Sequence, residues 1–181
     1  MIATLATLCG CASTTKMAYP TDWPAVARAS GADCDELAGV YSNDRYRTPD
    51  PRNYAYPLVV WLAGWNWAVS TRDYTEVEIS LLDAKPIVRV RRRVDKVWES
   101  VPLAGWTCRD GRLVGAPPEP VDGEGSATWH VAGTVTLARA TDRSLVVHAQ
   151  QRVLRQSLIF MNYEREEAWV LYPAIASAQV R

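Results

Sequence analysis

The chain has 181 residues, a length usual for one globular domain that buries a substantial core. Hydrophobic residues make up 48% of the chain and charged residues 22%, which argues against a wholly disordered protein. Basic and acidic side chains number 20 each, so no overall field attracts the protein to nucleic acid. Any electrostatic partner must therefore meet a local patch.

An uncharged segment opens the sequence. It is apolar as far as Leu8, and a polar run begins at Ala12. This segment is too short to span a membrane as a helix, because a span needs about 20 apolar residues. It is close to the short limit of a secretory signal, whose apolar region has about 7–15 residues.

The four residues Leu8-Cys9-Gly10-Cys11 resemble the lipobox of bacterial lipoproteins, in which a peptidase cuts before an acceptor cysteine. The resemblance implies that residues 1–10 are a signal peptide and that Cys11 is lipidated. Several acyl chains, each buried methylene contributing about 0.8 kcal/mol, would anchor the protein stably. Ala12 in place of aspartate implies the outer membrane, facing the periplasm. The alternative is an apolar N-terminus with a coincidental cysteine.

Residues 11–22 predict a lipidated tether, because they are small, polar and interrupted by Pro20. About ten extended residues would reach ~33 Å. Residues 23–181 are then a single β-rich domain. At its start, the segment from Trp23 to Ala29 suggests a short helical turn.

Cys34 and Cys108 remain once Cys9 is removed with the signal peptide and Cys11 is assigned to lipid, and the implied compartment is oxidising. We therefore expect them to form a disulfide. A loop of this length would stabilise the fold by roughly 4 kcal/mol in the chain-entropy model. A metal site is not expected, because no CxxC or HxxxH pattern supplies further ligands.

Leu37 to Ser42 predicts a first short strand. Its Gly39-Val40-Tyr41 loosely resembles the Gly-x-Trp of lipocalins, in which an aromatic side chain closes one end of a barrel. The resemblance covers this tripeptide alone and implies a carrier of a small apolar ligand.

The nearly apolar segment from Pro57 to Val69 predicts a helix that begins near Pro57. One interpretation is a core helix packed on a sheet. The other is an element that faces a ligand or an interface, because its three tryptophans are hard to bury together. Those residues are Trp61, Trp65 and Trp67.

Residues 75–94 predict a β-hairpin with Ala84 and Lys85 as its loop. With this loop, the register of the hairpin places polar side chains on one face and apolar side chains on the other. The expected polar pairs are Ser80 with Arg89, Glu78 with Arg91 and Glu76 with Arg93, and the apolar pairs are Ile79 with Val90 and Leu81 with Val88. The basic run is thus interpreted as a solvated strand face, and Arg92 falls on the apolar side.

Later segments predict further strands and turns. Asp110-Gly111 is typical of a tight hairpin turn, and residues 116–128 predict a loop rich in proline and glycine. Residues 134–140 and 145–152 predict an antiparallel pair, residues 154–163 fit either strand or helix, and residues 168–172 predict a last strand. Short turns without long helices indicate a mainly β fold, an antiparallel meander forming a barrel or half-barrel with one or two short helices.

Catalytic motifs are lacking, including GxSxG, HExxH and a phosphate-binding glycine loop. His148 falls in an apolar strand and is interpreted as a packed or edge histidine, whereas His130 borders the predicted loop. The acids near Asp33 and those from Glu164 to Glu167 fit solvated turns. No cofactor and no metal are expected.

Three functions follow from these features. The first is a non-catalytic binding or interaction module, anchored to the membrane and recruiting an envelope protein. The second is a lipocalin-like carrier of an apolar ligand, with a cavity lined by some of Trp61, Trp65, Trp67, Trp106 and Trp129. The third is a hydrolase that uses His130. A hollow domain would favour the carrier, and a filled interior would argue against it.

Overall fold

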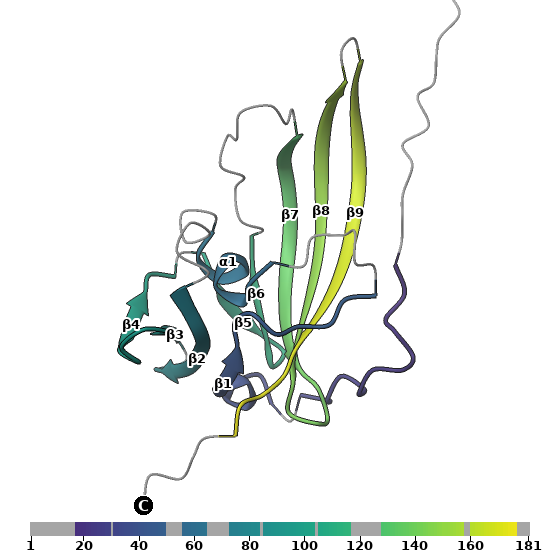
Figure 1. Ribbon diagram of the computed structural model, residues 1–181. Coiled ribbons are helices and arrows are strands. Elements are labelled where there is room, and N and C mark those ends of the chain that lie inside the picture. The colour runs from purple at the N-terminus through teal and green to yellow at the C-terminus, as the bar shows by residue number, and fades with distance from the viewer. Residues whose placement is uncertain are drawn as a thin grey trace, which may run out of the picture.

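The computed structural model describes residues 17–29, 31–49, 56–64, 73–83, 85–103, 105–116, 128–157 and 160–176. These residues form two antiparallel sheets, so the expected mainly β, antiparallel fold is confirmed (Figure 1). The four-stranded sheet contains β1 (Gly39–Ser42), β2 (Tyr74–Leu82), β3 (Lys85–Arg92) and β4 (Trp98–Val101). The five-stranded sheet contains β5 (Thr107–Arg109), β6 (Arg112–Gly115), β7 (Thr128–Arg139), β8 (Leu145–Ser157) and β9 (Phe160–Tyr172).

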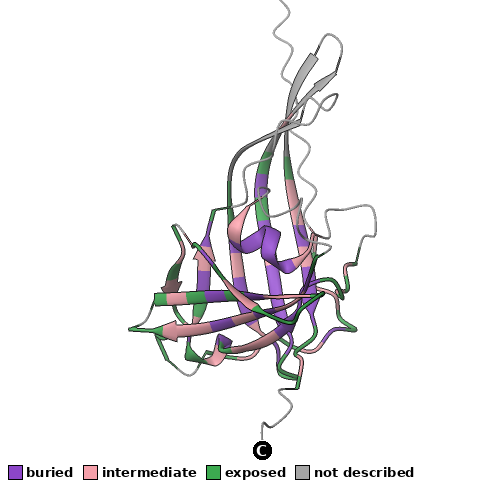
Figure 2. Ribbon diagram, turned by 60° about the vertical axis from the view of Figure 1, so that its left-hand side comes forward, coloured by how far each residue is buried: buried purple, intermediate pink, exposed green. Residues whose placement is uncertain are grey.

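The strands of the smaller sheet run across those of the larger one, as Figure 2 shows. The sheets meet where the chain after β9 passes along the edge of β1. There the Ser42 amide donates to the Pro173 carbonyl at 3.0 Å, and the Ile175 amide donates to the Val40 carbonyl at 2.8 Å. The described strands do not close into a barrel, because β4 and β5 remain edges that do not pair with each other. The expected antiparallel meander is therefore present as two separate sheets, each with its strands in chain order.

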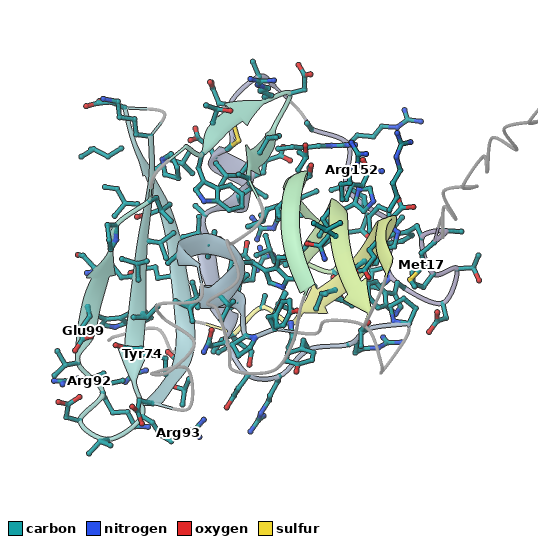
Figure 3. The ribbon with its side chains drawn as sticks, turned by 90° about the horizontal axis from the view of Figure 1, so that it is seen from above. Met17, Tyr74, Arg92, Arg93, Glu99 and Arg152 are labelled. Carbon is teal, nitrogen blue, oxygen red and sulfur yellow. A yellow bond between two sulfur atoms is a disulfide. The ribbon has the colours of Figure 1, made fainter. Side chains whose placement is uncertain are left out.

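Helix α1 (Leu58–Ala63) fills the space between the two sheets, as the view from above shows (Figure 3). All five residues from Leu58 to Leu62 are buried, with at most 3% of each exposed. The buried Asn43 holds its start, because its side-chain oxygen accepts from the Val59 amide at 2.9 Å. Pro57 precedes the helix as expected, and residues 65–69 of the predicted helix lie outside the described chain.

The β2–β3 hairpin forms, but its predicted register is wrong by two residues. Leu82 lies opposite Lys85, and Asp83, which follows β2, has a positive φ of 51°. The observed charged pairs are therefore Glu78 with Arg89 and Glu76 with Arg91, and the apolar pairs include Ile79 with Val88 and Val77 with Val90. A two-residue shift keeps every side chain on its face, so the alternating pattern could not detect it.

Arg92 and Arg93 take other partners. Arg92 lies where the register shifts beside Tyr74, and its Nε atom is 3.0 Å from Glu99. Arg93 pairs with Asp44 at 2.5 Å. Figure 3 labels both arginines at one end of the four-stranded sheet. The expected pairing of Glu76 with Arg93 and of Arg92 with Val77 is thus corrected.

The later hairpins agree with the sequence. Asp110 and Gly111 form the turn between β5 and β6, both with positive φ. The paired strands β7 and β8 extend beyond the predicted ranges, and residues 160–163 of the ambiguous segment belong to β9. Of the predicted loop over 116–128, residues 117–127 lie outside the described chain and Thr128 begins β7.

Near the N-terminus one local prediction is wrong, and the expected first strand is present but begins two residues later than predicted. The segment from Trp23 to Ala29 is extended, since Val26 forms a β-bridge with Ala140 and no helical turn. Leu37 ends a 3-10 turn, η1 (Asp35–Leu37), and the strand begins at Gly39. In both cases contacts with distant strands outweigh weak local preference.

Candidate functional site

The register of the five-stranded sheet brings five residues into one row across it, one from each strand. They are Thr107, Val114, Thr136, His148 and Trp169. Their sequence neighbours Leu113, Leu137, Val147 and Val170 are buried in the core, with at most 1% exposed. Because successive side chains of a strand point to opposite faces, the row lies on the face turned away from the core, here called the outer face.

The N-terminal segment, residues 17–29, covers one end of the outer face. Trp23 is buried there with Ala140, Val146 and Leu171 in a second small core. Tyr19 packs edge-on against the rings of Trp23 and Trp169, at centroid distances of 5.8 and 5.1 Å. Met17 to Asp22, expected to belong to the tether, are therefore in contact with the domain.

Met17 is held at the end of this segment by two side chains of β9. Its amide donates to Glu167 Oε2 at 3.0 Å, and its carbonyl accepts from the indole nitrogen of Trp169 at 2.9 Å. Figure 3 shows Met17 beside β9. Both backbone polar groups of Met17 are thus bonded to the sheet.

Glu167 is the centre of this contact. Its Oε1 atom lies 2.6 Å from His148 Nε2 and accepts from Gln150 Nε2 at 3.2 Å. Burial acts to raise the pKa of Glu167, but the hydrogen bonds from His148, Gln150 and the Met17 amide outweigh it and lower the pKa below its usual value. We therefore infer that Glu167 is ionised at neutral pH.

The imidazole of His148 is stacked on the indole of Trp169, with centroids 3.7 Å apart and planes within 5°. His148 is thus a packed histidine, as the sequence predicted. Both carboxylate oxygens of Glu167 are engaged by His148, Gln150 and Met17. The hydrogen bonds of this cluster therefore attach the N-terminal segment to the sheet. Glu167, expected in a solvated turn, lies instead inside β9.

The expected disulfide joins Cys34 to Cys108, with Cα atoms 5.8 Å apart. Cys34 precedes η1 and Cys108 lies in β5, so the bond ties the chain leaving the N-terminal segment to the edge of the five-stranded sheet. The described residues include no group of three or more metal-ligating side chains.

The predicted aromatic lining is only partly described. Trp61 is in the core with 1% exposed, and the indole nitrogen of Trp106 donates to the Leu62 carbonyl at 2.9 Å. A Cβ on Gly115 would lie 2.5 Å from the Trp106 ring, so glycine allows this close packing. These two tryptophans fill space around α1. Trp65 and Trp67, the side chains of Trp129 and His130, and Cys11 lie outside the described residues.

Sequence reasoning missed the joint role of Met17, Glu167 and Trp169. An available signal was the alternation in β8 and β9 of core residues with His148, Gln150, Glu167 and Trp169. That alternation shows which side chains share a face, but it does not indicate that a segment about 150 positions away in the sequence docks on them.

Comparisons with protein-family models, curated proteins and solved structures found no match for this chain. Among the described helices, none has the length and apolar character needed to cross a bilayer.

Proposed function

We propose that the protein is a bacterial envelope lipoprotein that is anchored through Cys11 and acts as a non-catalytic binding module. Its place is the outer membrane, on the periplasmic side. The lipobox-like Leu8-Cys9-Gly10-Cys11 supplies the anchor, and the oxidising compartment accounts for the Cys34–Cys108 disulfide.

The observation that carries the proposal furthest is the docking of Met17 on the outer face. Only residues 12–16 separate Cys11 from this point. Fully extended, that stretch reaches about 20 Å. A lipidated Cys11 would therefore keep the domain close to the headgroups, with the Met17 contact on the outer face within about 20 Å of the anchor.

Cell fractionation tests the anchor. The wild type and the C11A and C9A variants are expressed in a Gram-negative bacterium, and membranes are separated from the soluble periplasmic and cytoplasmic fractions. C9A is the matched control, because it alters a neighbouring cysteine and keeps the acceptor. We expect the wild type and C9A in the outer membrane, released by detergent, and C11A without acyl groups. Equal membrane association of C11A and wild type, with no acyl mass on either, would refute the proposal.

A further inference from the structure

A groove of about 570 Å³ lies on the outer face, between the last residues of the N-terminal segment and the β5–β6 hairpin. One wall is the stretch Val26 to Ala29, and the other is the β5–β6 turn from Arg109 to Arg112. Val114 and Thr136, directly opposite each other in the sheet, form the floor. The groove is therefore within the size range of small-ligand sites.

Three guanidinium groups line the groove. They belong to Arg28, Arg109 and Arg112, all exposed, and Asp110 is the one carboxylate among the lining residues, which leaves an excess of two positive charges. No hydrogen bond or ion pair engages these three arginines within the described chain. Arg109 also lies directly opposite Arg112, and like charges in that position destabilise a sheet. An anion bound between them would offset that repulsion.

Both walls are tied in place before any ligand binds. The Ala27 amide donates to the Arg139 carbonyl at 2.8 Å, and the Thr141 amide donates to the Ala25 carbonyl at 2.9 Å. On the other side the Cys34–Cys108 bond and a hydrogen bond from the Gly111 amide to Ala32 hold the turn. Such preorganisation lowers the entropy lost on binding.

We propose that this groove binds a phosphate monoester group. A guanidinium pairs with two phosphate oxygens at once, and a phosphate monoester carries about −1.5 to −2 charges at pH 7, which matches the excess in the groove better than a single carboxylate does. Thr136 adds a hydroxyl on the floor, and Val26 and Val114 offer apolar contact to the body of the ligand.

The phosphate has two sources, a lipid headgroup or a soluble phosphorylated molecule. The lipid source rests on the proposed function, because only an anchored domain would hold the groove near a membrane. The test uses the full chain carrying C11A, so that binding is measured without acyl groups. If the proposed anchor is wrong, the cell fractionation will show it, and the binding measurement on the C11A chain will be unaffected.

Binding is measured by calorimetry with glycerol phosphate, and by flotation with phosphatidylcholine vesicles with and without phosphatidic acid. The R109Q/R112Q variant should bind about tenfold more weakly or worse, and R28Q should show a smaller loss. The matched control is K85Q/K96Q, which removes the same charge from exposed positions at the start of β3 and in the β3–β4 turn and should bind like the parent. R109K/R112K, which keeps the charge without the planar fork, should bind with intermediate affinity.

Binding of glycerol phosphate would identify a soluble phosphorylated molecule as the source of the phosphate. Binding only to vesicles that contain phosphatidic acid would identify a lipid headgroup. Either result supports the groove when it is lost in R109Q/R112Q. Circular dichroism of that variant, unchanged from the parent, establishes that it folds. Absence of binding to both probes, or equal losses in R109Q/R112Q and K85Q/K96Q, overturns the proposal.

Discussion

The indole nitrogen of Trp169 donates to the carbonyl oxygen of Met17 at 2.9 Å, joining residues that are 152 positions apart. This bond, with the one from the Met17 amide to Glu167, closes the N-terminal segment over the outer face of the five-stranded sheet. The segment is thereby part of the domain, and its first described residue, Met17, is held by two side chains of β9.

Replacing Trp169 with phenylalanine keeps an aromatic ring and removes this donor. We expect a loss of about 1 kcal/mol in the free energy of unfolding, with faster amide hydrogen exchange over residues 17–29. W106F is the control, because it removes a similar indole hydrogen bond, whose acceptor is the Leu62 carbonyl of α1 and not a residue of the segment. Unchanged exchange over residues 17–29 in W169F, or an equal increase in W106F, would show that the Trp169 bond does not hold the segment.

Glu167→Gln removes the negative charge of a carboxylate that accepts hydrogen bonds from His148, Gln150 and the Met17 amide. At neutral pH we expect the free energy of unfolding to fall by about 1–3 kcal/mol. The folded protein lowers the pKa of Glu167 below its usual 4.5, so this stabilisation is present above that pH and is lost as pH falls through the folded value.

Chemical denaturation at a series of acidic pH values measures how the free energy of unfolding depends on pH and so checks this direction. The wild type should lose stability more steeply below pH 4.5 than E167Q, whereas D33N, an exposed carboxylate replaced in the same way, should follow the wild type. Parallel profiles for wild type and E167Q would contradict the role assigned to Glu167.

Removing the disulfide with C34S/C108S should lower the free energy of unfolding by roughly 4 kcal/mol, because the bond closes a loop of 74 positions in the unfolded chain. Denaturant titrations with and without reductant measure the loss. Reductant should bring the wild type to the level of C34S/C108S and leave that variant unchanged. A wild type insensitive to reductant under unfolding conditions would disprove the stabilising role.

The register of the β2–β3 hairpin makes a prediction that distinguishes the observed pairs from those expected from sequence. Double-mutant cycles with alanine should give coupling of about 0.2–1 kcal/mol between Glu76 and Arg91, which lie 3.1 Å apart. The pair Glu76 and Arg93 should give coupling near zero. A larger coupling energy between Glu76 and Arg93 than between Glu76 and Arg91 would instead support the register expected from sequence.

The strands and their faces were predictable from sequence, because alternation of apolar residues reports which face meets the core. The pairing was not, since Glu76 finds an arginine opposite in either register, and the positive φ of Asp83 that sets the loop has no strong local signal. At Asp110-Gly111, by contrast, the glycine identifies the turn, and the predicted hairpin was correct.

The outer-face cluster depended on contacts that local pattern does not encode. Residues 17–22 have the composition of a linker, yet Tyr19 packs on Trp169 and Met17 bonds to Glu167. The extended path of residues 23–29 likewise follows from the bridge between Val26 and Ala140. Only the folded sheet supplies these partners.

Intact-mass analysis of the protein extracted from bacterial membranes tests the central claim most directly. We predict a chain that begins at Cys11 and carries the added mass of a diacylglycerol and an amide-linked acyl group. A mass equal to that of the unmodified chain, with residues 1–10 retained, would contradict the anchor and the position that it gives to the outer face.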